Sequence, residues 1–208
     1  MFRNLFSPDT PLMVTMSQIT DCIFLSLFWF LCSIPLVTLG AATAALYDAV
    51  YHIYRKGDKN GWQRYFRSFR SNLKGSIPSS VLFVLLAAGL TRGTVLLWNH
   101  SVYGNISWGL FAAGAFLVFL AVGILSILFP MHSRFENSTG RLWSNTLRLA
   151  MARLPGTLSL SALNSFSIFL CLRYVFPLFF LPALACLIGS VFIEPMFRPF
   201  MPEESSGE

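Results

Sequence analysis

Residues 19–37, ITDCIFLSLFWFLCSIPLV, decide the fold class of this chain. They carry one charge, Asp21, near the start, and an α-helix of this length at 1.5 Å per residue comes close to the roughly 30 Å of bilayer hydrocarbon. Pro35 lacks a backbone N–H and fixes φ, so we expect a bend near the helix exit, and Gly40 allows the change of direction that follows. The stretch therefore predicts a first transmembrane helix that leaves the bilayer core near Gly40.

The composition of the whole chain also favours lipid as its solvent. Of the 208 residues, 55% are hydrophobic, 21 are Phe and only 12% are charged. Such a surface in water would expose large apolar patches. The net charge of +6 would suggest nucleic acid if the basic residues were not interleaved with apolar spans. We read them as loop charges that face the inner surface of a membrane, with no nucleic-acid partner.

The first basic segment, residues 55–74, gives the strongest topological signal. It holds seven Lys and Arg residues against Asp58 alone, which predicts a cytoplasmic segment. Aromatic and basic residues recur at helical spacing, as in an amphipathic helix. One interpretation is an anchor at the membrane interface, and the other is a docking surface for a cytoplasmic partner. The candidate docking residues here are Trp62, Arg64, Tyr65, Phe66, Arg67, Phe69, Arg70, Asn72 and Lys74.

The second basic segment, residues 132–155, repeats this character with four Arg residues against Glu136. It too predicts a cytoplasmic amphipathic helix, ended by Pro155-Gly156. Its candidate docking residues are Arg141, Asn145 and Arg148.

Residues 40–54 combine small residues at helical spacing with three tyrosines, Tyr47, Tyr51 and Tyr54. About 15 residues are too few to span alone, so we expect this helix to continue the first one past its bend or to lie along the inner interface. If it re-entered and spanned, the number of spans would be six and the N-terminal tail would be inside.

The fold class that follows is all-α, a single polytopic membrane domain over residues 1–201 with a disordered acidic tail over 202–208. Five spans are expected at about residues 17–38, 77–97, 106–131, 156–173 and 176–196. With both basic segments inside, this count places the C-terminus in the cytoplasm and the N-terminus outside. The expected location is a cell membrane.

Five polar residues within or beside the spans need partners: Asp21, Arg92, Asn164, Arg173 and Glu194. The charged ones lie near span ends, where their side chains can reach the interface, and none supplies the mid-membrane carboxylate that a proton relay needs. We expect Asp21 to pair with Arg92 or Arg173. Gly89 and Gly93, four residues apart, are candidates for close helix packing.

No motif in the chain predicts an enzyme. The phosphate-binding loop of ATPases and the serine-hydrolase elbow are absent, and no catalytic site is expected. The three histidines are scattered without metal-binding spacing, so no metal or other cofactor is expected. The cysteines lie in apolar runs without a Cys-x-x-Cys pair and are read as free thiols; they are Cys22, Cys32, Cys171 and Cys186.

Several sequence stretches resemble the YesL-like family of bacterial integral membrane proteins of unknown function. They are residues 4–13 (NLFSPDTPLM), 29–40 (WFLCSIPLVTLG), 44–47 (AALY) and 65–74 (YFRSFRSNLK), with weaker similarity around residues 134–137 and Asn145. The resemblance implies a membrane protein of Gram-positive-type bacteria whose genes often lie beside those for carbohydrate uptake and breakdown. It implies no catalytic residues.

Two hypotheses for function follow. The first is an accessory membrane subunit of a carbohydrate importer of the ABC type, which contacts a permease and an ATPase through its helices and basic loops. The second is a small self-sufficient transporter or channel that works as a homo-oligomer. Both place the lipid bilayer around the chain.

Overall fold

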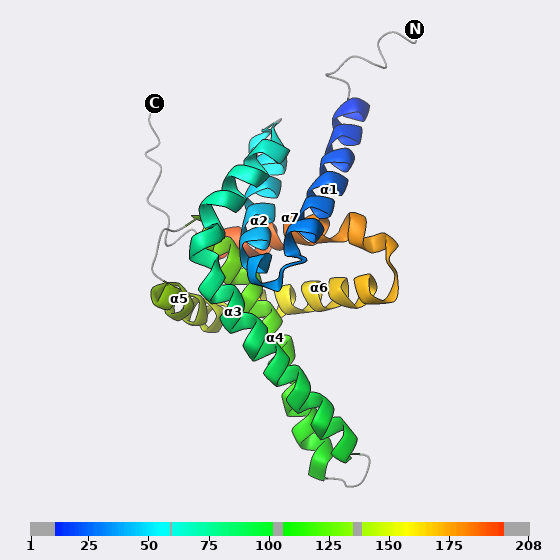
Figure 1. Ribbon diagram of the computed structural model, residues 1–208. Helices are drawn as coiled ribbons and strands as arrows, with labels where there is room; N and C mark the ends of the chain where they lie inside the picture. The colour runs from blue at the N-terminus through cyan, green and yellow to red at the C-terminus, as the bar shows by residue number, and fades with distance from the viewer. Residues whose placement is uncertain (1–10, 59, 102–105, 135–138, 198–208) are drawn as a thin grey trace.

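A computed structural model describes residues 11–58, 60–101, 106–134 and 139–197, and the regular elements in these ranges are all helical (Figure 1). The prediction of an all-α fold is confirmed, while the acidic tail at 202–208 lies outside the described residues. The α-helices are α1 (Pro11–Ser33), α2 (Leu39–Lys56), α3 (Gly61–Ser101), α4 (Ile106–Arg134), α5 (Thr139–Ala152), α6 (Leu154–Arg173) and α7 (Leu181–Phe197). Two short 3₁₀ helices, η2 (Leu36–Thr38) and η3 (Phe176–Phe179), lie in the turns after α1 and α6.

The chain reverses direction between α1 and α2. At the turn, the hydroxyl of Thr38 lies 2.6 Å from the carbonyl oxygen of Cys32, near the end of α1 where carbonyl groups lack their helical partners. The same hydroxyl lies 2.7 Å from the carbonyl oxygen of Pro35, which also accepts the backbone N–H of Thr38 over 2.8 Å. At the far end of the pair, the hydroxyl of Tyr54 donates to the carbonyl oxygen of Gln18 over 2.5 Å. The start of α1 and the end of α2 therefore lie side by side, as Figure 1 also shows.

This hairpin corrects the expectation for residues 40–54. They do not continue the first helix past its bend but form most of α2 and run back along α1, as in the alternative in which this segment re-enters. Small residues make the return possible, because they let neighbouring backbones approach closely. Together with the 3₁₀ helix η2 before it, α2 forms a segment, Leu36–Lys56, that is long and apolar enough to be a membrane span by length and composition.

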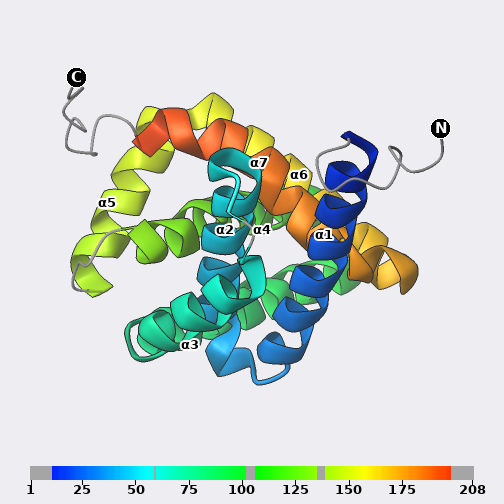
Figure 2. The ribbon, with the colours of Figure 1, turned by 90° about the horizontal axis from the view of Figure 1, so that it is seen from above.

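Helix α2 is the centre of the molecule, with α1, α3, α4 and α7 packed around it (Figure 2). Ala42, Ala44, Ala45 and Ala49 are fully buried. Gly40 marks a close approach, since a Cβ added there would clash with the hydroxyl oxygen of Ser80 on α3. The position thus serves close packing beyond the turn that the sequence predicted.

Helix α3 joins two predicted elements into one helix. Its 41 residues would extend about 60 Å, twice the hydrocarbon thickness, so it includes both the first basic segment and the span predicted at 77–97. Pro78 lies inside it, where its ring removes one helical hydrogen bond and favours a bend. In Figure 1 the first part of α3 runs beside α2, and the rest turns away to pair with α4.

The remaining helices complete the fold around α4. Helices α6 and α7 form a second hairpin that runs across the direction of α1 and α2 (Figures 1 and 2). Helix α6 touches α4 at Gly123, where an added Cβ would lie 2.8 Å from the backbone oxygen of Thr157. Helix α5 packs on α4 through buried side chains on one face; these are Leu142, Thr146 and Leu149.

Five described helices are long and apolar enough to cross a membrane, and they identify a multi-pass membrane protein: α1, α2, α3, α4 and α6. The number agrees with the sequence prediction, but the membership differs. Helix α2 belongs to the set, whereas α7, expected as the fifth span, is a shorter apolar helix of 17 residues.

Candidate functional site

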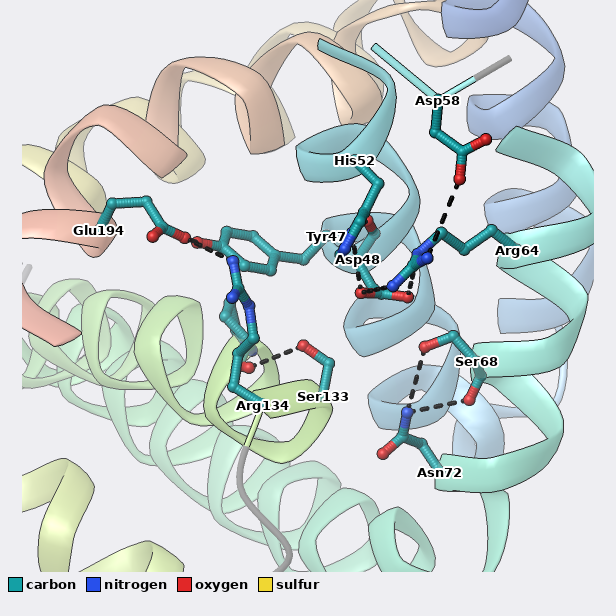
Figure 3. Close-up of polar contacts among 11 residues, drawn as sticks. Tyr47, Asp48, His52, Asp58, Arg64, Ser68, Asn72, Ser133, Arg134 and Glu194 are labelled. Atoms are coloured by element: carbon teal, nitrogen blue, oxygen red, sulfur yellow. Dashed lines mark hydrogen bonds and ion pairs between the residues drawn. The ribbon is translucent and has the colours of Figure 1, made fainter. Parts of the chain in front are cut away.

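The polar groups of the core converge on two consecutive residues of α2, Tyr47 and Asp48. With 3.6 residues per turn, consecutive helical side chains point about 100° apart. Tyr47 points towards α4 and α7, and Asp48 points towards α3 (Figure 3). Each residue therefore attaches a different part of the chain to the central helix.

Tyr47 belongs to a cluster with Arg134, at the end of α4, and Glu194 of α7. The Tyr47 hydroxyl donates to Glu194 Oε1 over 2.7 Å, and Arg134 Nη2 donates to the same oxygen over 2.9 Å. The guanidinium of Arg134 also stacks on the ring of Tyr51, 4.0 Å from its centroid. Tyr47 is 1% exposed, whereas the side chains of Arg134 and Glu194 are 18% and 19% exposed. Arg134 and Glu194 thus form a largely desolvated ion pair that Tyr47 and Tyr51 contact. We call these four residues the Tyr47 cluster.

Asp48 anchors the start of α3. Arg64 Nε donates to Asp48 Oδ2 over 3.1 Å, and Arg64 Nη1 lies 3.9 Å from Asp58 Oδ2 in the α2–α3 connection. His52, one turn further along α2, has its Nδ1 at 3.2 Å from Asp48 Oδ1 and 2.9 Å from the Asp48 carbonyl oxygen. Asp48 is 8% exposed, so its charge depends on these contacts for stabilisation.

A third set of polar contacts fixes α3 against α2 and α4. Ser80 Oγ accepts a hydrogen bond from the backbone N–H of Gly40 over 3.0 Å, and Ser79 Oγ lies 3.1 Å from His132 Nε2. Both serines are fully buried. They directly follow Pro78, so this part of α3 is attached to two different helices, α2 and α4.

The predicted docking residues of the first basic segment divide into two groups. Tyr65 is fully buried and stacks on Phe69 at 6.3 Å between centroids, and Phe66 packs on Phe28 of α1 at 5.1 Å. Arg64 is engaged with Asp48, and the side-chain amide of Asn72 donates to Ser68. The exposed members are Trp62, Arg67, Arg70 and Lys74, with Phe66 40% exposed.

Much of the aromatic content of this segment therefore serves packing of α3 against α1 and α2 rather than a docking surface. In the second basic segment, Arg141 and Arg148 on α5 are exposed and Asn145 is half-buried.

The polar residues predicted to need partners have different surroundings. Glu194 is paired with Arg134, and Asn164 Nδ2 donates to Ser126 Oγ of α4 over 3.0 Å. The expected pairing of Asp21 is wrong: within the described ranges, no ion pair joins it to Arg92 or Arg173.

Asp21 lies half-buried on α1, whereas both arginines are exposed. Arg173 instead lies 5.5 Å from the ring centroid of Tyr174. Helix ends that the hydropathy pattern places at one depth can still be far apart around the bundle.

The small residues Gly89 and Gly93 make no close helix contact inside the chain. A Cβ at either position would meet no described atom within 4 Å. Tight contacts occur at Gly40 and Gly123 instead. Gly40 belongs to the small residues at helical spacing that the sequence showed, whereas no spacing pattern indicated Gly123.

The sequence analysis also missed Tyr47, Asp48 and Arg134 as members of polar clusters. A signal existed for Asp48, an acidic residue within an alanine-rich apolar stretch, where an unpaired charge would be costly. No local pattern connects Arg134 with Glu194, 60 positions later.

These polar side chains connect helices to one another and do not form an array of reactive groups. The polar side chains around Tyr47 contact one another, and so do those around Asp48. Among the described residues, no three His, Cys, Asp or Glu side chains come together as metal ligands. An open groove lies on the outside of α3, lined by Phe66, Arg67 and Arg70.

Comparison with known proteins adds one match. Residues 22–92 match a family described as "Protein of unknown function, DUF624", which covers α1 from Cys22, all of α2 and α3 as far as Arg92. The matched segment thus contains the α1–α2 hairpin, Tyr47, Asp48 and Arg64. Neither the curated proteins nor the solved structures include a significant match.

Proposed function

We propose that this chain is an accessory integral membrane subunit of a bacterial carbohydrate importer of the ABC type. In this role it works through helix packing and through its basic cytoplasmic helices. Support comes from the resemblance of its N-terminal stretches to the YesL-like family, whose genes often lie beside those for carbohydrate uptake. The match of residues 22–92 to the family of unknown function is compatible with that resemblance.

The observation that carries the proposal is the use of polar side chains within the fold. Tyr47, Arg134 and Glu194 are occupied with one another, as are Asp48 and Arg64. A transporter that forms its own path needs polar groups along a channel or cavity, and these groups serve instead to hold helices together.

The side chains on the outside of the fold are mainly apolar or basic. Exposed large side chains are numerous on the spans, for example Leu85 at 66% and Phe169 at 62%. The exposed arginines of α5, Arg141 and Arg148, provide a separate basic face. A permease would contact the apolar faces, and an ATPase or another cytoplasmic partner would contact α5.

We further propose that both ends of the described chain face the cytoplasm. The contact between Tyr54 and Gln18 places the start of α1 beside the end of α2, which leads directly into the first basic segment. If that segment is inside, so is the start of α1, which corresponds to the alternative in which α2 re-enters the membrane rather than to an outside N-terminus. Glu194 contacts Arg134, which leads into the second basic segment, so the end of α7 lies on the same side.

The test is purification in mild detergent from cells that express the chain at its natural level from its own locus. Recovery of a permease and an ATPase in fixed ratio supports the accessory role. Recovery of a homo-oligomer that moves a sugar when reconstituted alone would refute it in favour of a self-sufficient transporter.

A further inference from the structure

The arginines on the first part of α3 are of two kinds. Arg64 is engaged with Asp48 and Asp58, and its charge is used within the fold. Arg67 and Arg70 are exposed, and within the described ranges no carboxylate lies within 4.0 Å of either. These two guanidinium groups are therefore available to a ligand.

Both arginines line one groove together with Phe66. Arg70 lies three residues after Arg67 and four after Phe66, so its side chain neighbours both of them on the helix surface. Phe66 is fixed from behind by the ring of Phe28 at 5.1 Å and that of Tyr65 at 5.5 Å. The groove thus has one rigid aromatic wall and two cationic groups, whose planar forks suit phosphate oxygens.

The same face of α3 becomes apolar further along the helix. Steps of three or four residues lead from Arg70 through Lys74 to Ile77, Val81 and Leu85, and these last three are 38%, 40% and 66% exposed. Arg70 and Ile77 are separated by about 10 Å along the helix axis. This distance exceeds the thickness of the polar layer of a bilayer, roughly 5–8 Å on each side, so Ile77 reaches hydrocarbon when Arg70 lies at the membrane surface.

We propose that this groove binds the headgroup phosphate of an anionic phospholipid, whose acyl chain lies along Ile77, Val81 and Leu85. Charge complementarity selects an anion, and the continuous apolar stripe selects one that carries a hydrocarbon chain rather than a free phosphate or an acidic peptide. The site goes beyond the importer role and requires only that the basic part of α3 lies at the membrane surface. Bound lipid would fix the angle at which α3 enters the bilayer.

The experiment measures lipid bound to the full chain by native mass spectrometry in detergent. Phosphatidylglycerol is titrated against phosphatidylcholine, which has the same phosphate but no net charge. The test variant is Arg67→Gln with Arg70→Gln, and the matched control is Arg141→Gln with Arg148→Gln on α5, which removes the same charge elsewhere. Phosphatidylglycerol affinity should fall about fivefold for each arginine lost from α3, hence roughly 25-fold in the double variant, and clearly less in the control.

A second variant, Leu85→Ser, tests the acyl-chain part of the site. It should weaken phosphatidylglycerol binding while leaving binding of glycerol 3-phosphate, a headgroup without chains, unchanged.

Equal loss of phosphatidylglycerol in the α3 and α5 double variants would overturn the proposal, because attraction would then depend on net charge alone. Binding of glycerol 3-phosphate as tight as that of the lipid would overturn it too. So would unchanged lipid binding in the α3 variant accompanied by loss of a co-purifying acidic protein, which would assign the groove to a protein partner. Failure to recover an importer leaves these lipid measurements unaffected, so the two proposals are tested separately.

Discussion

Replacing Glu194 by glutamine removes the carboxylate that both Arg134 and Tyr47 contact. The shape of the side chain is kept, so packing at the end of α7 should change little. What changes is the charge opposite an arginine that is only 18% exposed. The variant therefore measures how strongly this one group holds α7 and α4 to the central helix.

The expected cost follows from burial. Removing one partner of a buried ion pair costs roughly 3–5 kcal/mol because the other charge is left desolvated. Here each side chain keeps about a fifth of its exposure, so water can relieve part of the penalty. We therefore expect Glu194→Gln to lower the free energy of unfolding by about 2–3 kcal/mol, at or just below the lower limit of that range. Tyr47→Phe, which removes only a hydrogen bond to a charged group, should cost about 1.5 kcal/mol.

The assay is equilibrium unfolding of the purified chain, titrated from a mild detergent into sodium dodecyl sulfate and followed by circular dichroism. Arg134→Gln should destabilise to a similar degree although it changes the net charge in the opposite direction, which excludes a general charge effect. The double variant Arg134→Gln with Glu194→Gln should cost less than the sum of the two single changes, because no charge is left unpaired.

A substitution on α5 serves as the control. Arg141 is exposed, and its replacement by Gln should change stability by less than about 0.5 kcal/mol. If Glu194→Gln is no more destabilising than Arg141→Gln, the Tyr47 cluster does not hold the helices together and the reasoning fails.

Three other predictions follow from the packing and the hairpin. In Gly123→Ala the new methyl meets a backbone oxygen of α6, which should cost about 1–3 kcal/mol of stability, reduced by the gain in helix propensity. Gly89→Ala has open space around it and should not destabilise the protein. Equal thermal melting of the two variants would contradict this prediction. In a cysteine-free background, a cysteine at Met16 should be shielded from an impermeant thiol reagent in intact cells and one at Ile34 labelled; the reverse pattern would place the start of α1 outside. Asp48→Asn should cost about 1–3 kcal/mol by weakening the attachment of α3, and a melting temperature equal to the wild type would exclude that role.

The composition and length of the apolar runs were sufficient to predict an all-α membrane protein. That information is local, since a helix in lipid must satisfy its own backbone hydrogen bonds, and about 20 apolar residues suffice to cross. The amphipathic character of residues 61–74 and of α5 was equally readable from helical spacing. So was the need of Glu194 for a partner, because an isolated charge near lipid is costly.

The tertiary structure decided which residues meet. The sequence suggested Asp21 as a partner of Arg92 or Arg173 from depth alone, but depth leaves the position around the bundle open. Arg134 and Glu194 meet only because the ends of α4 and α7 both pack on α2. Aromatic side chains of the predicted docking surface are partly interior for the same reason. Amphipathicity shows that one face of a helix is apolar, but it does not show whether lipid or another helix covers that face.

The return of α2 along α1 is the largest difference between the sequence analysis and the fold. The sequence contained the features that permit this return, a proline-containing turn and a run of small residues. About 15 weakly apolar residues nevertheless lie below the length expected of a span. Span length is a criterion for helices that face lipid, and α2 is surrounded by protein, where close backbone contacts and the pairing of the buried Asp48 with the partly exposed Arg64 stabilise it instead. Sequence alone determined that the chain belongs in a membrane, whereas only the packing of distant segments determined which helix lies at its centre.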